Sequence, residues 1–454
     1  MERRTRRNAL IALTVTTLVA AGCGSDKAAT KTTTAGATAD TTATATDATP
    51  APSGAADDNK VTIWSSIDQP VQDGLQKDLT AKLEADGITV DWQKVEDINK
   101  LIMQKIQAKD TPDIALIPQP GVVGGMVDLG AGNPLDDVLD MAALKASMVP
   151  GTLEAGTING KLYGLLVSMN VKSLVFYNKK AWDEKGYKAP TSIDELNALT
   201  ETIKADGGTP WCMGMESGDA TGWAATDWFE DLIMRYGGVD GYNKWVKHET
   251  LFDSDLVRQA AAEYEKLMFT DGNVLGGREA IASTNFGDAG KPMFDAAGPK
   301  CWLLKQGSFI TGFFPDAIKA DLDTNVGVFG FPAATAGGDN PVLGGGDLAV
   351  MLDNSASTQK AMQALASVDV GKSAVDSSYL SPHKDFPIDL YKGDLAQSFA
   401  KVAYSSSSFL FDGSDQMPGA VGSGTFWKDM TSWISGDEDL DTALKNIDAS
   451  WPTS

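Results

Sequence analysis

The sequence predicts an α/β protein whose sheets are mainly parallel and are flanked by helices. Between residues 61 and 117, short apolar runs alternate with stretches of helical periodicity in the order β-α-β-α-β. About 395 residues follow the N-terminal segments, which is enough chain for two lobes with cores of their own. Within the run 162–177, the polar Asn170 and Lys172 interrupt apolar strand material. That run fits either a strand crossing between two buried sheets or an ordinary hairpin within one domain.

Residues 1–22 predict a signal peptide. Four arginines stand among the first seven residues, and the apolar run 9–21 is too short for a permanent membrane helix. The small residues before Cys23 resemble a bacterial lipobox, although Ala20 stands where leucine is usual. We expect Cys23 to be lipidated and to hold the protein on the outer side of the cell membrane. The alternative is a plain secretory signal with an unmodified cysteine.

Residues 23–58 predict a disordered tether, because this Ala- and Thr-rich segment has almost no large apolar side chain to offset the entropy of ordering. The whole chain carries a net charge of −23. This charge disfavours binding to nucleic acid, to an anionic membrane surface or to a phosphorylated ligand, and it is compatible with a neutral ligand.

The sequence shows no pattern for a metal site or for a catalytic triad. His248 and His383 lie far apart, and neither a zinc-protease motif nor a Gly-x-Ser-x-Gly motif occurs. We therefore expect no metal and no cofactor. Acidic residues are abundant, so a glycoside hydrolase with two carboxylates stays open. Cys212 and Cys301 form either a disulfide, which export favours, or two buried thiols.

The first half of the body divides into elements by periodicity and by turn residues. Gly87 is expected to end the first helix. Ligands of parallel sheets bind at the carboxyl ends of the strands, so Trp64, Ser65 and Gln119 are candidate contacts. Strands are expected at 61–64, 88–92 and 113–117, and helices over 71–83 and 98–106.

The most unusual stretch is the glycine-broken loop 210–228. It contains three tryptophans together with Glu216 and Asp227. Aromatic faces pack on the C–H faces of sugars, and carboxylates accept hydrogen bonds from hydroxyls. In the alternative interpretation this stretch is a core strand leading into a helix, and we expect about half of its aromatic residues to be core.

Several segments together resemble the extracellular solute-binding proteins of bacterial carbohydrate ABC importers, the maltose-binding-protein-like family. They are 160–164, 176–179, 189–196, 298–309, 326–332 and 343–350. The resemblance extends from Val61 to Trp451. The pairing of Trp211-Cys212 with Cys301-Trp302 looks closest to the α-glucoside-binding subgroup.

The resemblance implies a two-lobed periplasmic-binding-protein fold with the ligand cleft between the lobes. The expected lobes are 59–168 plus 325–375 and 172–320 plus 382–454. The implied function is capture of a neutral oligosaccharide, an α-glucoside of the maltose, trehalose or sucrose type, and its delivery to the permease subunits. We expect a monomer that is not an enzyme.

The contacts implied by the resemblance combine one stacking residue, Trp223, with groups that read hydroxyls and with glycines that admit a close ligand. The full set is Trp64, Ser65, Gln119, Asn170, Glu216, Ser217, Trp223, Asp227, Gln306, Gly345, Gly346 and Asp347. Three alternatives remain: an exported glycoside hydrolase, a binding protein for a polyol or glycerol derivative, and a surface lipoprotein that binds another protein.

Overall fold

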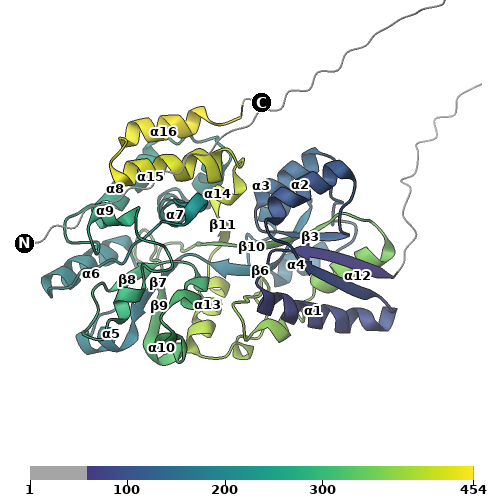
Figure 1. Ribbon diagram of the computed structural model, residues 1–454, viewed down its shortest axis with the longest axis horizontal. Coiled ribbons are helices and arrows are strands. Elements are labelled where there is room, and N and C mark those ends of the chain that lie inside the picture. Colours follow the sequence, from purple (N-terminus) through teal and green to yellow (C-terminus); the bar gives the residue numbers. More distant parts are fainter. Residues whose placement is uncertain (1–58, 453–454) are drawn as a thin grey trace, which may run out of the picture. The chain divides into compact units, whose positions relative to one another are not determined.

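The computed structural model describes residues 59–452, which contain two main sheets (Figure 1). The expected signal peptide, Cys23 and the tether lie outside the described residues. The larger sheet has the order β11-β10-β3-β1-β2, with β6 paired to β10. Its strands are β1 (Lys60–Ser65), β2 (Thr89–Lys94), β3 (Ile114–Ile117), β6 (Gly164–Val171), β10 (Val342–Met351) and β11 (Phe409–Phe411).

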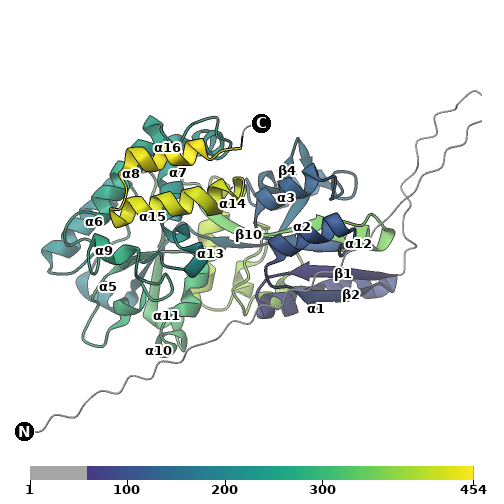
Figure 2. The ribbon, with the colours of Figure 1, turned by 45° about the horizontal axis from the view of Figure 1, so that its top comes forward.

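Helices cover both faces of the larger sheet, which we call the sheet of lobe 1. The two views agree that α1 lies on one face and that α2 and α3 lie on the other (Figures 1 and 2). All four residues of β3 are buried, as expected for a central strand. The helix bounds are α1 (Gln69–Leu83), α2 (Ile98–Ala108), α3 (Pro120–Asp128), α4 (Met141–Ser147) and α12 (Ala356–Leu365).

The second sheet belongs to lobe 2 and has the order β8-β7-β9. Its strands are β7 (Leu174–Asn178), β8 (Leu303–Lys305) and β9 (Val326–Gly330). The larger helices of this part are α5 (Lys179–Lys185), α6 (Ile193–Ala205), α7 (Trp223–Val246), α8 (Asp255–Met268), α13 (Asp394–Tyr404), α15 (Trp427–Ser435) and α16 (Leu440–Ala449). The shorter elements of lobe 2 are α9 (Arg278–Ile281), α10 (Asp316–Lys319), α11 (Leu322–Asn325) and α14 (Gly413–Gln416). Lobe 1 also contains the two short strands β4 (Thr157–Ile158) and β5 (Lys161–Leu162).

The polar interruption at Asn170 and Lys172 is a crossing between sheets, not a hairpin. β6 pairs with β10, whereas β7 pairs with β8 and β9. β6 and β10 run antiparallel, with Asn170 opposite Gly345. They lie side by side between the two groups of helices (Figure 1). The chain therefore passes between the sheets where its apolar pattern is broken.

Three details of the sequence expectation are wrong. The sheet of lobe 2 is antiparallel, because β8 and β9 both run opposite to β7. The strand β11 lies in the sheet of lobe 1, although residues 382–454 were expected in lobe 2. In addition, β9 lies in the sheet of lobe 2, although residues 325–375 were expected in lobe 1. The cause is that the chain returns to lobe 1 through β10, whose residues Leu348–Met351 pair with β3. Both β9 and β10 are apolar, glycine-containing strands, so composition did not distinguish them.

A disulfide joins Cys212 and Cys301, with a Cα–Cα distance of 5.3 Å. This confirms the disulfide that export favoured over two buried thiols. Trp211 and Trp228 are buried in the core of lobe 2, whereas Trp223 is only partly buried. Two of the three tryptophans in the unusual loop are thus core residues. Within residues 59–452, none of the helices combines the length and the apolar character needed to span a bilayer.

Candidate functional site

Four aromatic side chains form a partly exposed surface, here called the aromatic wall: Trp223, Phe286, Phe309 and Phe313. The Trp223 ring lies 5.1 Å from Phe286 and 5.8 Å from Phe309, measured between ring centroids. Phe286 in turn lies 5.0 Å from Phe313. Phe313 is 44% exposed, and the other three rings are partly buried. The wall offers apolar contact area that the fold leaves accessible.

Three separate segments bring these rings together. Trp223 is the first residue of α7, Phe286 follows the short helix α9, and Phe309 and Phe313 stand on the 3₁₀ helix η5 (Ser308–Phe313). A Cβ at Gly287 would overlap the Phe313 ring in its present position, so a larger residue there would displace that ring. Since the rings come from distant parts of the sequence, no local pattern predicts the wall as a unit.

A polar rim borders the wall at Glu216. Its carboxylate accepts a hydrogen bond from Asn285 Nδ2 at 2.7 Å and another from the backbone N–H of Gly218 at 2.8 Å. These two bonds lower the pKa of the Glu216 carboxyl, so the group is ionised at neutral pH. Ser217 follows it, and its backbone N–H donates to Thr221 Oγ1. Glu216 is therefore a fixed hydrogen-bond acceptor next to Phe286.

The crossing strands β6 and β10 contribute polar groups that can form further hydrogen bonds. Asn170 Oδ1 is buried and has no hydrogen-bond partner among the described residues. Gly345 lies opposite Asn170, and at Gly346 a Cβ would collide with the carbonyl oxygen of Ser168. Burial and the nearby negative charge of Asp68 raise the pKa of Asp347 to about 7. An unpartnered amide oxygen of this kind is what a ligand hydroxyl satisfies.

Behind the wall lies a group that we call the charged cluster: Lys172, Asp227, Glu230 and Asp412. Lys172 Nζ lies 3.1 Å from Asp227 Oδ1 and 2.5 Å from Asp412 Oδ2. The same ammonium stands 5.3 Å from the centroid of the Trp223 ring. Glu230 accepts hydrogen bonds from the backbone N–H groups of Gly413 and Ser414. The cluster thus joins the crossing, α7 and the loop that follows β11.

Burial and the charge of Lys172 act in opposite directions on the pKa values of the acidic residues of the cluster. Burial raises the pKa of Asp227 to about 8, against the opposing attraction of Lys172. For Asp412 burial is outweighed by the charge of Lys172 and its hydrogen bond, and the pKa falls to about 2. Asp227, Glu230 and Asp412 are close enough together to hold a metal ion. Because the Lys172 ammonium already neutralises this charge, we assign the group as an ion-pair cluster.

The remaining expected contacts are held mainly within the protein. Ser65 is fully buried, and its hydroxyl accepts a hydrogen bond from Trp92 Nε1 at 2.8 Å. Gln306 is buried, and its side-chain oxygen accepts from the backbone N–H of Gly307. Trp64 is partly buried at the end of β1, with Lys105 near its ring. We leave Ser65 out of the proposed contacts because its hydroxyl is enclosed.

Gln119 connects the two lobes. Its Nε2 donates to Asp415 Oδ1 at 2.8 Å, and its Oε1 accepts from Asn99 at 2.9 Å. Gln119 caps α3 in lobe 1, whereas Asp415 lies on α14 near lobe 2. Both ends of the amide are used, so in this conformation Gln119 ties the lobes together and is not free for a ligand. Asp227 is likewise engaged on one oxygen, although its Oδ2 has no partner among the described residues.

Sequence reasoning missed five side chains of this region: Lys172, Asn285, Phe286, Phe309 and Phe313. Lys172 had been noted only as a break in a strand, and its role depends on carboxylates far along the chain. Phe309 occupies the aromatic position of a recognisable segment and was not selected. Phe286 and Phe313 resemble core residues in sequence, and only their exposure in the fold marks them out.

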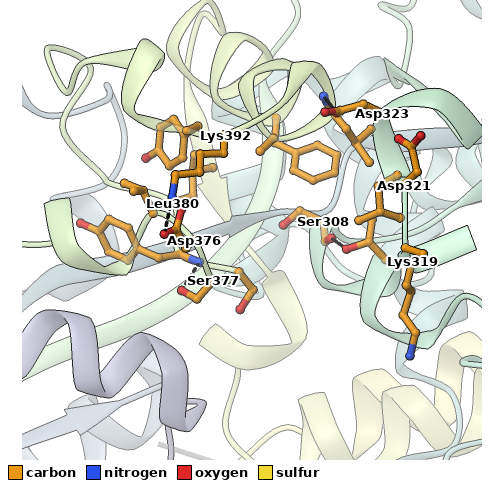
Figure 3. A pocket seen from close by; sticks show the side chains of 18 residues that line it. Ser308, Lys319, Asp321, Asp323, Asp376, Ser377, Leu380 and Lys392 are labelled. Atoms are coloured by element: carbon orange, nitrogen blue, oxygen red, sulfur yellow. Dashed lines mark hydrogen bonds and ion pairs between the residues drawn. The ribbon is translucent and has the colours of Figure 1, made fainter. Parts of the chain in front are cut away.

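A separate cavity of about 570 Å³ lies on the other side of η5. Figure 3 shows Asp376, Ser377, Leu380 and Lys392 along one side and Ser308, Lys319, Asp321 and Asp323 along the other. Lys392 pairs with Asp376 at 2.7 Å, and Lys319 with Asp316 at 2.9 Å. The residues lining it include Ser308, the chain neighbour of Phe309, and none of the expected contacts. Its lysines are already paired with carboxylates.

Comparison with known proteins gives a consistent picture. The profile of the family described as bacterial extracellular solute-binding protein matches residues 68–369. The alpha-glucosides-binding periplasmic protein AglE of Rhizobium meliloti is 35% identical over 382 residues, which are 81% of this chain and 82% of that protein. The osmoprotective compounds-binding protein GgtB of Synechocystis is 33% identical over 405 residues, which are 89% of this chain and 95% of that protein.

Solved structures show the same fold at low sequence identity. The bacterial solute receptor AcbH aligns with a TM-score of 0.73 at 17% identity, over 86% of this chain and 98% of its own. The cyclic alpha-maltosyl-1,6-maltose binding protein of Arthrobacter globiformis gives a TM-score of 0.66 at 18% identity, over 86% and 97%. The sugar-binding protein MalE of Xanthomonas citri gives 0.66 at 16% identity, over 86% and 95%.

Proposed function

Because the chain belongs to the bacterial extracellular solute-binding proteins, we propose that it captures a neutral α-glucoside for an ABC importer. The observation that carries this proposal is the aromatic wall bordered by the fixed carboxylate of Glu216. Such a surface matches the two chemistries of a sugar, because apolar C–H faces pack on rings and hydroxyls donate to a carboxylate. AglE, a relative with 35% identity, is named for binding alpha-glucosides.

The proposed contacts are those that the fold leaves partly accessible or unsatisfied. Trp223 provides the stacking face, Glu216 accepts from hydroxyls, and Asn170 Oδ1 accepts another. Ser217, Gly345, Gly346, Asp347 and Trp64 remain secondary candidates. The bound sugar would lie against lobe 2 and close to the crossing strands. No step of this proposal is catalytic, in agreement with relatives that are named as binding proteins.

Binding is proposed to close the lobes about the crossing β6 and β10, with ligand contacts completed in the closed state. For this purpose lobe 1 comprises 59–168 and 342–375 together with β11 (Phe409–Phe411), and lobe 2 comprises 172–341 and the rest of 382–454. The hydrogen bond from Gln119 to Asp415 would hold one edge of this boundary. Closure would then present a single surface, built from both lobes, to the permease subunits.

The N-terminal proposals concern location. We infer that residues 1–22 direct export, that Cys23 is lipidated, and that residues 23–58 let a monomeric body stand away from the membrane. The family of extracellular solute-binding proteins supports export, and the anchor itself rests on the sequence before Cys23. Mass spectrometry of the wild-type protein from the membrane fraction should find the lipid mass on Cys23. The Cys23→Ser variant should lack this mass and appear in the soluble fraction.

A second candidate ligand is an osmoprotective solute, such as a polyol or a glycerol derivative. It is favoured by the 33% identity to GgtB across 89% of this chain. Both candidates are small neutral molecules rich in hydroxyls, so the site chemistry alone does not separate them. An exported hydrolase is disfavoured, because both relatives at this level of identity are named as binding proteins.

The test is thermal unfolding of the purified body, from about residue 58 onward, in the presence of single solutes. The panel contains maltose, trehalose, sucrose, maltotriose, glucosylglycerol, cellobiose and glucose. A ligand that binds only the folded state raises the melting temperature. At a ligand concentration of a hundred times the Kd, the free energy of unfolding rises by about 2.7 kcal/mol. We expect a selective rise with an α-glucoside. A rise with glucosylglycerol alone would favour the second candidate, and no rise with any solute would contradict both.

A further inference from the structure

We propose that the contact between α14 and the start of α3 is a latch that holds the two lobes together through the protein's own groups. The latch consists of Asp415 on α14 and of Gln119 and Gly121 at the start of α3. Both views show these two elements side by side (Figures 1 and 2). The inference rests on the lobe closure of the proposed function, and it names the contact that sets the balance between the closed and the separated arrangement.

The latch is fastened to lobe 2 at the base of α14. The Asp412 carboxylate accepts hydrogen bonds from the backbone N–H of Asp415 at 3.0 Å and from Ser414 Oγ at 2.7 Å. Its second oxygen accepts from Lys172 Nζ, and the Glu230 carboxylate of α7 accepts from the first two backbone N–H groups of α14. Asp415 therefore stands on a short helix that is bound to α7 and moves with lobe 2.

Lobe 1 holds its half of the latch in a fixed orientation. Gln119 stands at the N-cap position of α3 and donates from Nε2 to Asp415 Oδ1 at 2.8 Å. Asn99 of α2 donates to Gln119 Oε1 at 2.9 Å and thereby orients the amide. Because Asn99 and Gln119 both belong to lobe 1, this lobe aligns the amide with α14 by itself.

Gly121 allows the backbones of the two lobes to touch. A Cβ added there would lie 2.7 Å from the carbonyl oxygen of Met417 and 3.2 Å from those of Asp415 and Gln416. These atoms belong to the backbone, which cannot turn aside as a flexible side chain can. A larger residue at position 121 therefore moves α3 and α14 apart, and with them the lobes.

The other glycines of α3 make no such contact. Within residues 59–452, a Cβ at Gly124 would meet no atom closer than 4 Å, and a Cβ at Gly125 would touch only the side chain of Met103, at 3.5 Å. A cavity of about 200 Å³, lined by residues of both lobes, lies beside the contact. The contact is therefore narrow, so the lobes can separate without exposing a large apolar area to water.

The experiment measures the distance between the lobes by double electron–electron resonance on the body from about residue 58 onward. Spin labels are attached to two introduced cysteines, Gln104→Cys and Lys428→Cys. Both positions are exposed, one on α2 of lobe 1 and the other on α15 of lobe 2. Cys212 and Cys301 are bonded to each other and do not take the label. Distances are recorded without solute and with each solute of the thermal panel.

Three variants test the latch. Gly121→Leu inserts a side chain between the lobes, and Gly124→Leu makes the same change on the same helix at a position with free space. Gln119→Leu removes the hydrogen bond to Asp415 without adding bulk. Circular dichroism and the melting temperature establish that each variant is folded. If Gly121→Leu is not folded, Gln119→Leu decides the outcome.

We expect Gly121→Leu to lengthen the mean distance by more than about 2 Å, Gln119→Leu to add a population at longer distance, and Gly124→Leu to match the wild type. A solute that binds the closed arrangement should bind Gly121→Leu about tenfold more weakly, because fewer molecules are competent to bind. Unchanged distances in both Gly121→Leu and Gln119→Leu, or an equal change in Gly124→Leu, would overturn the latch.

The same distances separate the latch from the proposed function. If solutes change the wild-type distance while Gly121→Leu and Gln119→Leu do not, the proposed closure stands and the latch falls. If Gly121→Leu changes the distance and no solute does, the latch stands and closure by a solute falls. If neither changes the distance, both fall.

Discussion

The aromatic wall and the charged cluster lie on two sides of one residue, Trp223, and they invert the usual rule of burial. Apolar rings are left accessible in the wall, whereas Lys172 and three carboxylates are enclosed in the cluster. Lys172 is near both, because its ammonium stands 5.3 Å from the Trp223 ring centroid. A fold gains little stability from exposed rings and loses some by desolvating charges. Each departure therefore points to a role other than maximal stability.

The two regions differ in what holds them. The rings of the wall touch each other across three segments and keep one side open. Every member of the cluster makes hydrogen bonds within the protein, so its geometry is determined without a ligand. The rings of the wall thus keep a surface open to a ligand, whereas the charged groups of the cluster are already paired within the protein. Mutations in the two regions should accordingly separate affinity from stability.

The largest effect is expected for Lys172→Ala. Removal of the ammonium leaves the Asp412 carboxylate buried without its cation and takes a hydrogen-bond donor from Asp227, which costs about 3–5 kcal/mol of unfolding free energy. Chemical denaturation measures this loss. The matched control is Lys180→Ala, because Lys180 is 84% exposed and its pair with Glu184 spans 4.0 Å. The control should change stability by under about 0.5 kcal/mol. Equal stability of the two variants would show that the cluster contributes nothing.

The next effect is the loss of affinity in Trp223→Ala. Removal of the stacking face should weaken the α-glucoside about a hundredfold, which corresponds to about 2.7 kcal/mol. The melting temperature should fall less than in Lys172→Ala, because Trp223 is only partly buried. Trp223→Phe should retain part of the affinity. Calorimetric titration of the three proteins with the ligand found in the thermal panel checks this order. Unchanged affinity in Trp223→Ala would remove the wall from the binding site.

A smaller effect is expected from pH acting on Asp227. Its folded pKa of about 8 lies above the unfolded value of 3.8, so the folded state holds the proton more tightly. The resulting stability is fully present below pH 3.8 and is lost as the pH rises through 8. The slope from one such group is at most about 1.4 kcal/mol per pH unit. Glu230, Asp347 and Asp415 also have raised pKa values and act in the same direction.

Asp227→Asn isolates this contribution. The amide is uncharged at every pH, so stability should fall less steeply between pH 5 and pH 8 than in the wild type, as the wild-type pKa of about 8 requires. Asp412 does not interfere in that range, because its pKa of about 2 places its transition at acid pH. Denaturation curves at four pH values are sufficient. A slope as steep as that of the wild type would mean that Asp227 holds no proton there.

Much of the fold was predictable because it depends on local periodicity. The helices and strands between Val61 and Ile117 follow from apolar spacing. The break in that spacing at Asn170 fitted a crossing or a hairpin, and the strand pairing shows the crossing. The direction of β8 and the sheet membership of β9 were not predictable, because strand partners are chosen in three dimensions. The same limit applies to the site. Trp223 and Glu216 lie in one unusual loop, whereas Phe286 and Phe313 become neighbours only after folding.

Burial separates the expected contacts that the fold encloses from those that it leaves accessible. Asp227 was selected as a group that reads hydroxyls, yet it faces Lys172 inside the protein. Ser65 lies at the carboxyl end of a strand, as the rule for parallel sheets requires, but Trp92 encloses its hydroxyl. A sequence shows that a polar residue is near a site and does not show which way its side chain points. Exposure had to come from the structure.

The bond between Cys212 and Cys301 has a practical consequence for anyone who produces this protein. The two cysteines are 89 positions apart, and the enclosed chain contains α7 and α8. Cross-linking a loop of this length lowers the conformational entropy of the unfolded chain, which in the chain-entropy model stabilises the folded state by about 4–5 kcal/mol. Material made in the bacterial cytosol, where thiols stay reduced, would lack that contribution. Preparations from the cytosol and from the periplasm of an expression host are therefore two different starting materials, and a thiol assay of each batch tells them apart.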